Sequence, residues 1–178
     1  MRLFVAAELP DEVLEALAET SAVLRDCVKG RYVAPDSFHI TLAFLGEVAQ
    51  ERVDAAADAL DAACRGFNSF DVTLGELGSF GKRSSATLWQ GFFDSGNLAD
   101  LADTVRRELK ARGFSFDEKN FKAHVTLMRK ADLTRGELPM PSIAGGTVEH
   151  VTLFRSDLSG SRPVYEPLHT VELGELGA

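Results

Sequence analysis

Apolar and polar residues alternate along several short stretches of the chain, which is the pattern of β-strands with one buried face. The two clearest stretches are Phe38–Leu45 and Phe121–Met128, and each contains a histidine followed two residues later by a threonine. Weaker strand patterns occur at Arg2–Leu9, Tyr32–Val33, Phe70–Leu77, Ala86–Phe93, Thr147–Arg155 and about Val164–Leu173. The chain is therefore expected to contain many short strands.

A longer period of three to four residues predicts three helices: one that opens at Pro10-Asp11, one over Glu51–Arg65 and one over about 97–112. A polar loop at Gly78–Ser85 and a glycine- and proline-rich linker at Gly136–Gly146 separate other elements. Strands and helices do not alternate as in βαβ units, so we expect an α+β fold with antiparallel sheet. The element order resembles an approximate duplication. It predicts two pseudo-symmetric lobes of antiparallel sheet that face a central cleft, with helices on the outer faces.

Length and composition are those of an ordinary globular chain. With 178 residues, 45% of them apolar and 26% charged, the sequence predicts a single two-lobed domain over residues 1–178. Cys27 and Cys64 have no CxxC spacing, so we expect buried thiols in place of a disulfide or zinc site. No apolar run approaches the ~18 residues of a membrane helix, and the N-terminus does not read as a signal peptide. We expect a cytoplasmic monomer.

The net charge of −8 argues against a protein that wraps a long polynucleotide, because such proteins usually carry a basic face. It leaves room for a small or terminal phosphate held by a few local cations. Taken singly, each basic stretch is more simply a solvated surface charge. Four stretches could supply the cations: Lys29-Gly30-Arg31, Lys82-Arg83, Lys119 with Lys122, and Arg129-Lys130.

The candidate chemistry lies in a repeated His-x-Thr-Leu pattern, which begins at His39 and again at His124. On a strand, His39 and Thr41 point to one face, and His124 and Thr126 do the same in the second copy. Two imidazoles and two hydroxyls on two matched strands are suited to acid/base chemistry on a phosphoester. We expect both pairs to face one cleft.

The pattern occurs a third time, at His150-Val151-Thr152-Leu153. Physical reasoning from the residues alone does not separate the second copy from the third, since either could place an imidazole on a sheet face. His169 lacks the pattern and is expected to be structural. A lone histidine on a strand is more often structural than catalytic, but two matched His-x-Thr pairs reverse that preference.

The surrounding residues resemble the two-histidine phosphoesterase superfamily, and within it the bacterial and archaeal RNA 2′,3′-cyclic phosphodiesterases, also called 2′-5′ RNA ligases. In order along the chain, the resemblance rests on Arg2–Ala6, Arg31–Gly46, Leu88-Trp89, Phe121–Arg129, Leu153–Ser156 and Tyr165. By this resemblance the catalytic pair is His39 and His124, and His150 is a chance match. Tyr32 stands where the family often has Trp, and Ala123 where it often has Pro, and neither change removes a titrating group.

The resemblance implies metal-free hydrolysis of an RNA 2′,3′-cyclic phosphate to a 2′-phosphomonoester, with His39 as the acid and His124 as the base. The residues alone leave the two roles interchangeable. Thr41 and Thr126 are expected to bind the non-bridging phosphate oxygens. Arg129 and Lys122 place cations beside the second histidine, and Phe80 is a candidate for stacking on a base. Trp89 is at least as well explained as a core residue.

Three alternatives remain open from sequence. The first is the reverse reaction, ligation of RNA through a 2′-5′ bond, which needs no ATP because the cyclic phosphate is already activated. The second is hydrolysis of a small cyclic nucleotide, which the acidic chain mildly favours. The third is a non-catalytic module that binds RNA ends, although binding alone would not require two titratable groups.

No cofactor or metal is expected, because neither motif brings a carboxylate or cysteine into its segment and no HExxH spacing occurs. We predict that turnover of a cyclic-phosphate substrate survives dialysis against EDTA and needs no nucleoside triphosphate. A steady-state assay before and after dialysis checks this. Loss of turnover on chelation, with recovery on adding a divalent ion, would contradict the prediction.

Overall fold

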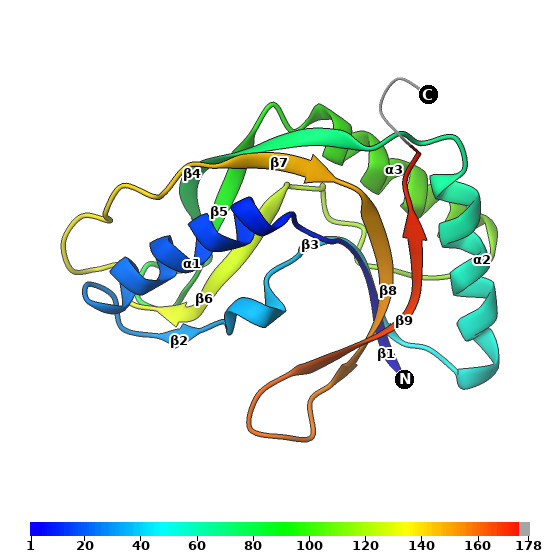
Figure 1. Ribbon diagram of the computed structural model, residues 1–178. Coiled ribbons are helices and arrows are strands. Elements are labelled where there is room, and N and C mark those ends of the chain that lie inside the picture. The colour runs from blue at the N-terminus through cyan, green and yellow to red at the C-terminus, as the bar shows by residue number, and fades with distance from the viewer. Residues whose placement is uncertain (175–178) are drawn as a thin grey trace.

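The computed structural model describes residues 1–174, which form two antiparallel sheets and three α-helices (Figure 1). The four-stranded sheet has the order β3 (Ile40–Glu47), β1 (Arg2–Ala7), β8 (His150–Asp157) and β9 (Val164–Glu172). The five-stranded sheet has the order β2 (Arg31–Tyr32), β6 (His124–Ala131), β5 (Ala86–Phe93), β4 (Phe70–Phe80) and β7 (Gly145–Val148). The expectation of an α+β fold with antiparallel sheets is confirmed.

The helices cover the sheet faces opposite the histidines. Helix α1 (Asp11–Arg25) follows β1 in the chain but lies along the five-stranded sheet, where it contacts β7 (Figure 1). Helices α2 (Val53–Cys64) and α3 (Gly96–Ala111) pack on each other and on the four-stranded sheet. Short 3₁₀ turns at Pro35–Ser37 and Gln50–Arg52 precede β3 and α2. Apolar residues of the helices and of the inner strand faces form the buried core.

Each sheet takes strands from distant parts of the chain. Strands β1 and β3 come from the beginning of the sequence and pair with β8 and β9 from its end. The five-stranded sheet combines β2 with the middle strands β4 to β7. Neither sheet can therefore form from one contiguous half of the sequence, and the two histidine strands, β3 and β6, lie in different sheets.

Three expectations about local structure were wrong. Thr147–Arg155 was predicted as one strand, but it divides between β7 and β8, which belong to different sheets. The polar loop at Gly78–Ser85 is shorter than expected, because β4 continues through Gly78 as far as Phe80. Cys64 is buried as predicted, whereas Cys27 is exposed, because it follows α1 and its neighbour Val28 takes the core position.

Within residues 1–174, no helix is both long and apolar enough to cross a membrane. The expectation of a single domain stays a prediction.

Candidate active site

Both motif histidines lie where their strands begin. His39 immediately precedes β3, and His124 is the first residue of β6. The His39 Nδ1 is 2.7 Å from the Ser37 carbonyl oxygen, and the His124 Nδ1 is 2.5 Å from that of Lys122. A carbonyl oxygen can only accept a hydrogen bond, so each Nδ1 carries the proton. The Nε2 of each ring is therefore unprotonated and can accept a proton or a hydrogen bond in the cleft.

The threonine of the first motif contacts its histidine directly. Thr41 Oγ1 lies 2.9 Å from His39 Nε2, and since the neutral ring has its proton on Nδ1, the hydroxyl donates this bond. This hydrogen bond places the Thr41 hydroxyl next to the reactive nitrogen of His39.

A small cavity of about 40 Å³ joins the two motifs. Its lining residues come from both sheets: Val33, Ser37, His39, Thr41, His124, Thr126, Arg129 and Tyr165. The central cleft predicted between the two lobes is therefore present, with one imidazole from each side.

A larger cavity of about 480 Å³ adjoins the small one, because Thr41 and His124 line both. Its volume lies within the range of small-molecule sites. Its lining is aromatic and charged: Phe44, Phe80, Arg106, Asp117, Lys119, Asn120, Phe121 and Lys122. All seven site residues predicted from sequence line one of these two cavities.

A β-bulge turns Arg129 into the cleft. Simple alternation would place residue 128 on the face of His124 and Thr126, but Thr126 pairs with Trp89 and Met128 pairs with the next residue, Leu88. The extra residue in β6 reverses the alternation, so Met128 is buried and Arg129 reaches the small cavity.

The first motif carries a matching bulge, where Thr41 pairs with Ala6 and Ala43 with Val5. This bulge turns Phe44 toward the larger cavity. The two strands are thus equivalent in geometry, but one presents an arginine where the other presents a phenylalanine.

Each imidazole is packed by an aromatic ring held almost perpendicular to it. Tyr165 contacts His39 with ring centres 5.3 Å apart at 87°, and Phe80 contacts His124 at 5.2 Å and 87°. Trp89, for which a core position was at least as plausible, lies on the cleft face, 5.8 Å from His124. The Lys122 Nζ lies 5.4 Å from the Trp89 ring centre, a cation–π contact that holds its charge near the larger cavity.

Sequence reasoning did not identify Tyr165, Phe44 or Arg106 as site residues. Tyr165 was part of the family resemblance, but nothing in its local pattern predicts a contact with His39. Arg106 lies on α3 and donates from Nε to the carbonyl of Leu42 at 2.9 Å and from a terminal nitrogen to that of Lys119 at 2.9 Å. No short motif surrounds it, so only the tertiary contacts place it at the cavity.

Burial and neighbouring positive charge keep both imidazoles neutral in the ligand-free protein. The pKa of His39 is lowered from 6.5 to about 4, first by burial and then by the positive charge of Arg129 and His124, against the raising effect of the Ser37 carbonyl. The pKa of His124 is also lowered, first by burial and then by Arg129 and Lys122. An anion between the rings would reverse these charge effects and raise both pKa values.

The other two histidines lie outside these cavities. His150 lines a separate pocket beside Glu8, Glu12 and Glu149, and His169 contacts Asp61 at 2.7 Å. No group of three histidine, cysteine or acidic side chains suited to a metal ion occurs in the described part of the chain.

Comparison with known proteins places this geometry in context. The model of the LigT-like phosphoesterase family matches residues 7–89 and 94–165. An RNA 2′,3′-cyclic phosphodiesterase of Archaeoglobus fulgidus is 32% identical, with 97% of this chain and 100% of the relative covered. An RNA 2′,3′-cyclic phosphodiesterase of Thermotoga maritima is 30% identical, with 95% of this chain and 94% of the relative covered. A crystal structure of Escherichia coli LigT complexed with 3′-AMP matches with a TM-score of 0.80, 31% identity and 97% coverage of both chains.

The floor of the site depends on Gly78. A Cβ at this position would lie 2.3 Å from the Trp89 ring, so Gly78→Ala must displace the indole that supports His124 and Lys122. We predict a loss of about 1–3 kcal/mol in the free energy of unfolding, measured by urea denaturation. Gly96→Ala is the matched control, since its Cβ would have no heavy atom nearer than 3.8 Å. Equal stability of the two variants would contradict the prediction.

Proposed function

The chain belongs to the LigT-like phosphoesterase family, of the two-histidine phosphoesterase superfamily, and on this basis we propose that it hydrolyses the 2′,3′-cyclic phosphate at the end of an RNA. The observation that carries the proposal is the pair of imidazoles that present Nε2 to one small polar cavity from opposite sheets.

The proposed step is an in-line displacement at phosphorus. Water attacks the cyclic phosphate, and its proton passes to the neutral Nε2 of His124. The bond from phosphorus to the 3′ oxygen breaks, and the protonated Nε2 of His39 gives its proton to that oxygen. The products are a 3′-hydroxyl and a 2′-phosphomonoester, and the proton gained by His124 returns to solvent as His39 is reprotonated.

The site offers stabilisation for the charge that grows on phosphorus. Thr41 and Thr126 line the small cavity with hydroxyl donors, and Arg129 brings a positive charge to the same space. Donors fixed in advance act strongly because they need no reorganisation during the reaction. The hydroxyl of Thr41 exchanges its bond to His39 for a phosphate oxygen when substrate enters, which frees Nε2 for proton transfer.

Substitution of each histidine tests the proposal. We expect His39→Ala and His124→Ala to lower kcat/KM for a 2′,3′-cyclic-phosphate substrate by about 10²–10⁴, the usual contribution of one general acid or base. His150→Ala is the control, because it lies in a separate pocket and should retain full activity. A substrate with a good leaving group should restore His39→Ala far more than His124→Ala, since only water activation then needs help. The opposite ranking would reverse the roles, and wild-type binding without turnover would indicate an RNA-end-binding module.

The pH dependence follows from the lowered pKa values. Turnover needs one protonated and one neutral imidazole, so kcat/KM should be bell-shaped, with apparent pKa values that belong to the pair. Because both pKa values are lowered in the free protein, we predict that the alkaline limb of kcat/KM lies below pH 6.5. The bound phosphate anion raises them, so the alkaline limb of kcat should lie at higher pH.

Initial rates from pH 4 to 9 give both profiles. Trp89, the only tryptophan in the sequence, supplies an independent measurement, because a protonated His124 in contact with it quenches indole emission. Its fluorescence should change with a midpoint below 6.5 in the free protein. Coincident alkaline limbs for kcat and kcat/KM would contradict the interpretation.

A further inference from the structure

Positive charge is concentrated at one end of the five-stranded sheet. Three segments, residues 25–31, 82–83 and 129–135, hold eight of the 19 lysines and arginines but only two of the 27 acidic residues. The chain as a whole has a net charge of −8, so the rest of the protein is strongly acidic. We call these eight exposed side chains the basic surface: Arg25, Lys29, Arg31, Lys82, Arg83, Arg129, Lys130 and Arg135.

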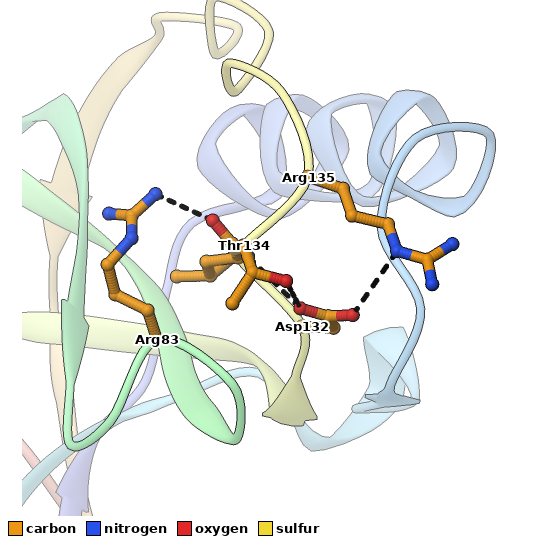
Figure 2. A network of polar contacts seen from close by, with 5 residues as sticks. Arg83, Asp132, Thr134 and Arg135 are labelled. Atoms are coloured by element: carbon orange, nitrogen blue, oxygen red, sulfur yellow. Dashed lines mark hydrogen bonds and ion pairs between the residues drawn. The ribbon is translucent and has the colours of Figure 1, made fainter.

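Backbone contacts hold the three segments side by side. The Asp132 amide donates to the Lys29 carbonyl at 2.9 Å, and Leu133 and Arg83 exchange two hydrogen bonds, at 2.7 and 2.6 Å. Figure 2 shows Arg83 beside the stretch after β6, while Arg135, which belongs to that stretch, extends on its opposite side and contacts Asp132. Asp132 offsets part of this charge, because its Oδ2 lies 3.8 Å from the Arg135 Nε, while Thr134 donates two hydrogen bonds to its Oδ1.

The centre of the basic surface is an unfavourable pair. Arg31 on β2 lies directly opposite Arg129 on β6 in the antiparallel register, so both side chains point to the cleft face. Like charges directly opposite each other destabilise a sheet. Within residues 1–174, neither guanidinium makes a side-chain hydrogen bond or an ion pair with the protein. Two unpaired guanidinium groups side by side are a binding site for phosphate oxygens.

We propose that the basic surface binds the RNA strand on the 5′ side of the reacting end, and that Arg31 holds an internucleotide phosphate next to Arg129. This inference rests on the proposed function and makes an oligonucleotide, in preference to a cyclic mononucleotide, the substrate of the site.

The position of the surface supports a strand of RNA as its occupant. Arg129 belongs both to the basic surface and to the small cavity between the histidines. Lys82 follows Phe80 by two residues, and Phe80 lines the larger cavity. A chain that leaves the cleft at either point therefore meets successive positive charges, each able to contact one phosphate of the backbone.

Binding measurements test the surface without turnover. The probe is a fluorescein-labelled hexaribonucleotide with a terminal 2′-phosphate, followed by anisotropy. We expect Arg31→Gln to weaken binding about tenfold, in keeping with one charge-assisted contact. The slope of log Kd against log salt should fall by about 0.7, as for one phosphate contact with a single strand. Arg31→Lys should recover most of the affinity.

Stability and a matched variant separate binding from structure. Arg65→Gln removes an exposed arginine at the end of α2, outside the basic surface, and should leave both affinity and salt slope unchanged. Arg31→Gln should unfold at the same temperature as the wild type or slightly above it, because it removes the repulsion with Arg129. A clear loss of stability together with the loss of binding would assign Arg31 a structural role and overturn the proposal.

Kinetics link the surface to the substrate. We expect the ratio of kcat/KM for a cyclic-phosphate hexanucleotide over that for a cyclic mononucleotide to fall about tenfold in Arg31→Gln. Equal losses for both substrates would overturn the proposal, since Arg31 would then act on the reacting phosphate alone. If the wild type hydrolyses neither substrate, the proposed function fails, but charge-dependent hexanucleotide binding would still support the surface. Absence of such binding would overturn it in favour of another acidic partner, such as a protein.

Discussion

The hydrogen bond from each imidazole Nδ1 to the carbonyl two residues earlier is the contact on which the site depends. It fixes the tautomer, because the carbonyl can only accept, and it fixes the ring plane at the point where the strand begins. Without this hydrogen bond, a buried neutral imidazole could carry its proton on either nitrogen, and the nitrogen that faces the cleft would not be fixed as the acceptor. A perpendicular aromatic ring also packs against each imidazole and restricts its rotation: Tyr165 against His39 and Phe80 against His124. The two half-sites reach equivalent geometry through different neighbours.

The relative position of the two histidines depends on a sheet that combines strands from the beginning and the end of the chain. Because β8 and β9 complete the sheet that β1 and β3 begin, the distance between the two histidine strands is set by the whole core. Arg106 adds a direct tie, since its guanidinium bonds the bulge residue Leu42 of one motif strand and the Lys119 carbonyl ahead of the other. Such a frame suits a reaction that needs an acid and a base on opposite sides of one phosphorus atom.

Sequence alone predicted the helices, most of the strands and the face shared by each motif histidine and its threonine, because these follow from residue periodicity. It could not choose between His124 and His150 on physical grounds, since the choice depends on which sheet each strand joins. It identified Arg129 as a cation beside the second histidine but could not explain its orientation, because simple alternation gives Met128 the cleft position and only the bulge in β6 exchanges them. Phe80 was assigned to the polar loop predicted at Gly78–Ser85, although β4 continues as far as Phe80. In the structure that glycine makes room for the ring of Trp89.

Net charge was the least informative property of the sequence for function, and the reason is physical. A sum over the chain discards position, whereas the potential at a site is set by charges within about 10 Å at physiological salt. In this protein most acidic residues lie elsewhere, and among the described residues 1–174 the like-charged pair of Arg31 and Arg129 has no ion-pair partner. Like charges directly opposite each other destabilise a sheet, and a phosphate bound at the proposed site would remove that repulsion. At the proposed site, the binding energy of an anion would thus include the relief of this repulsion.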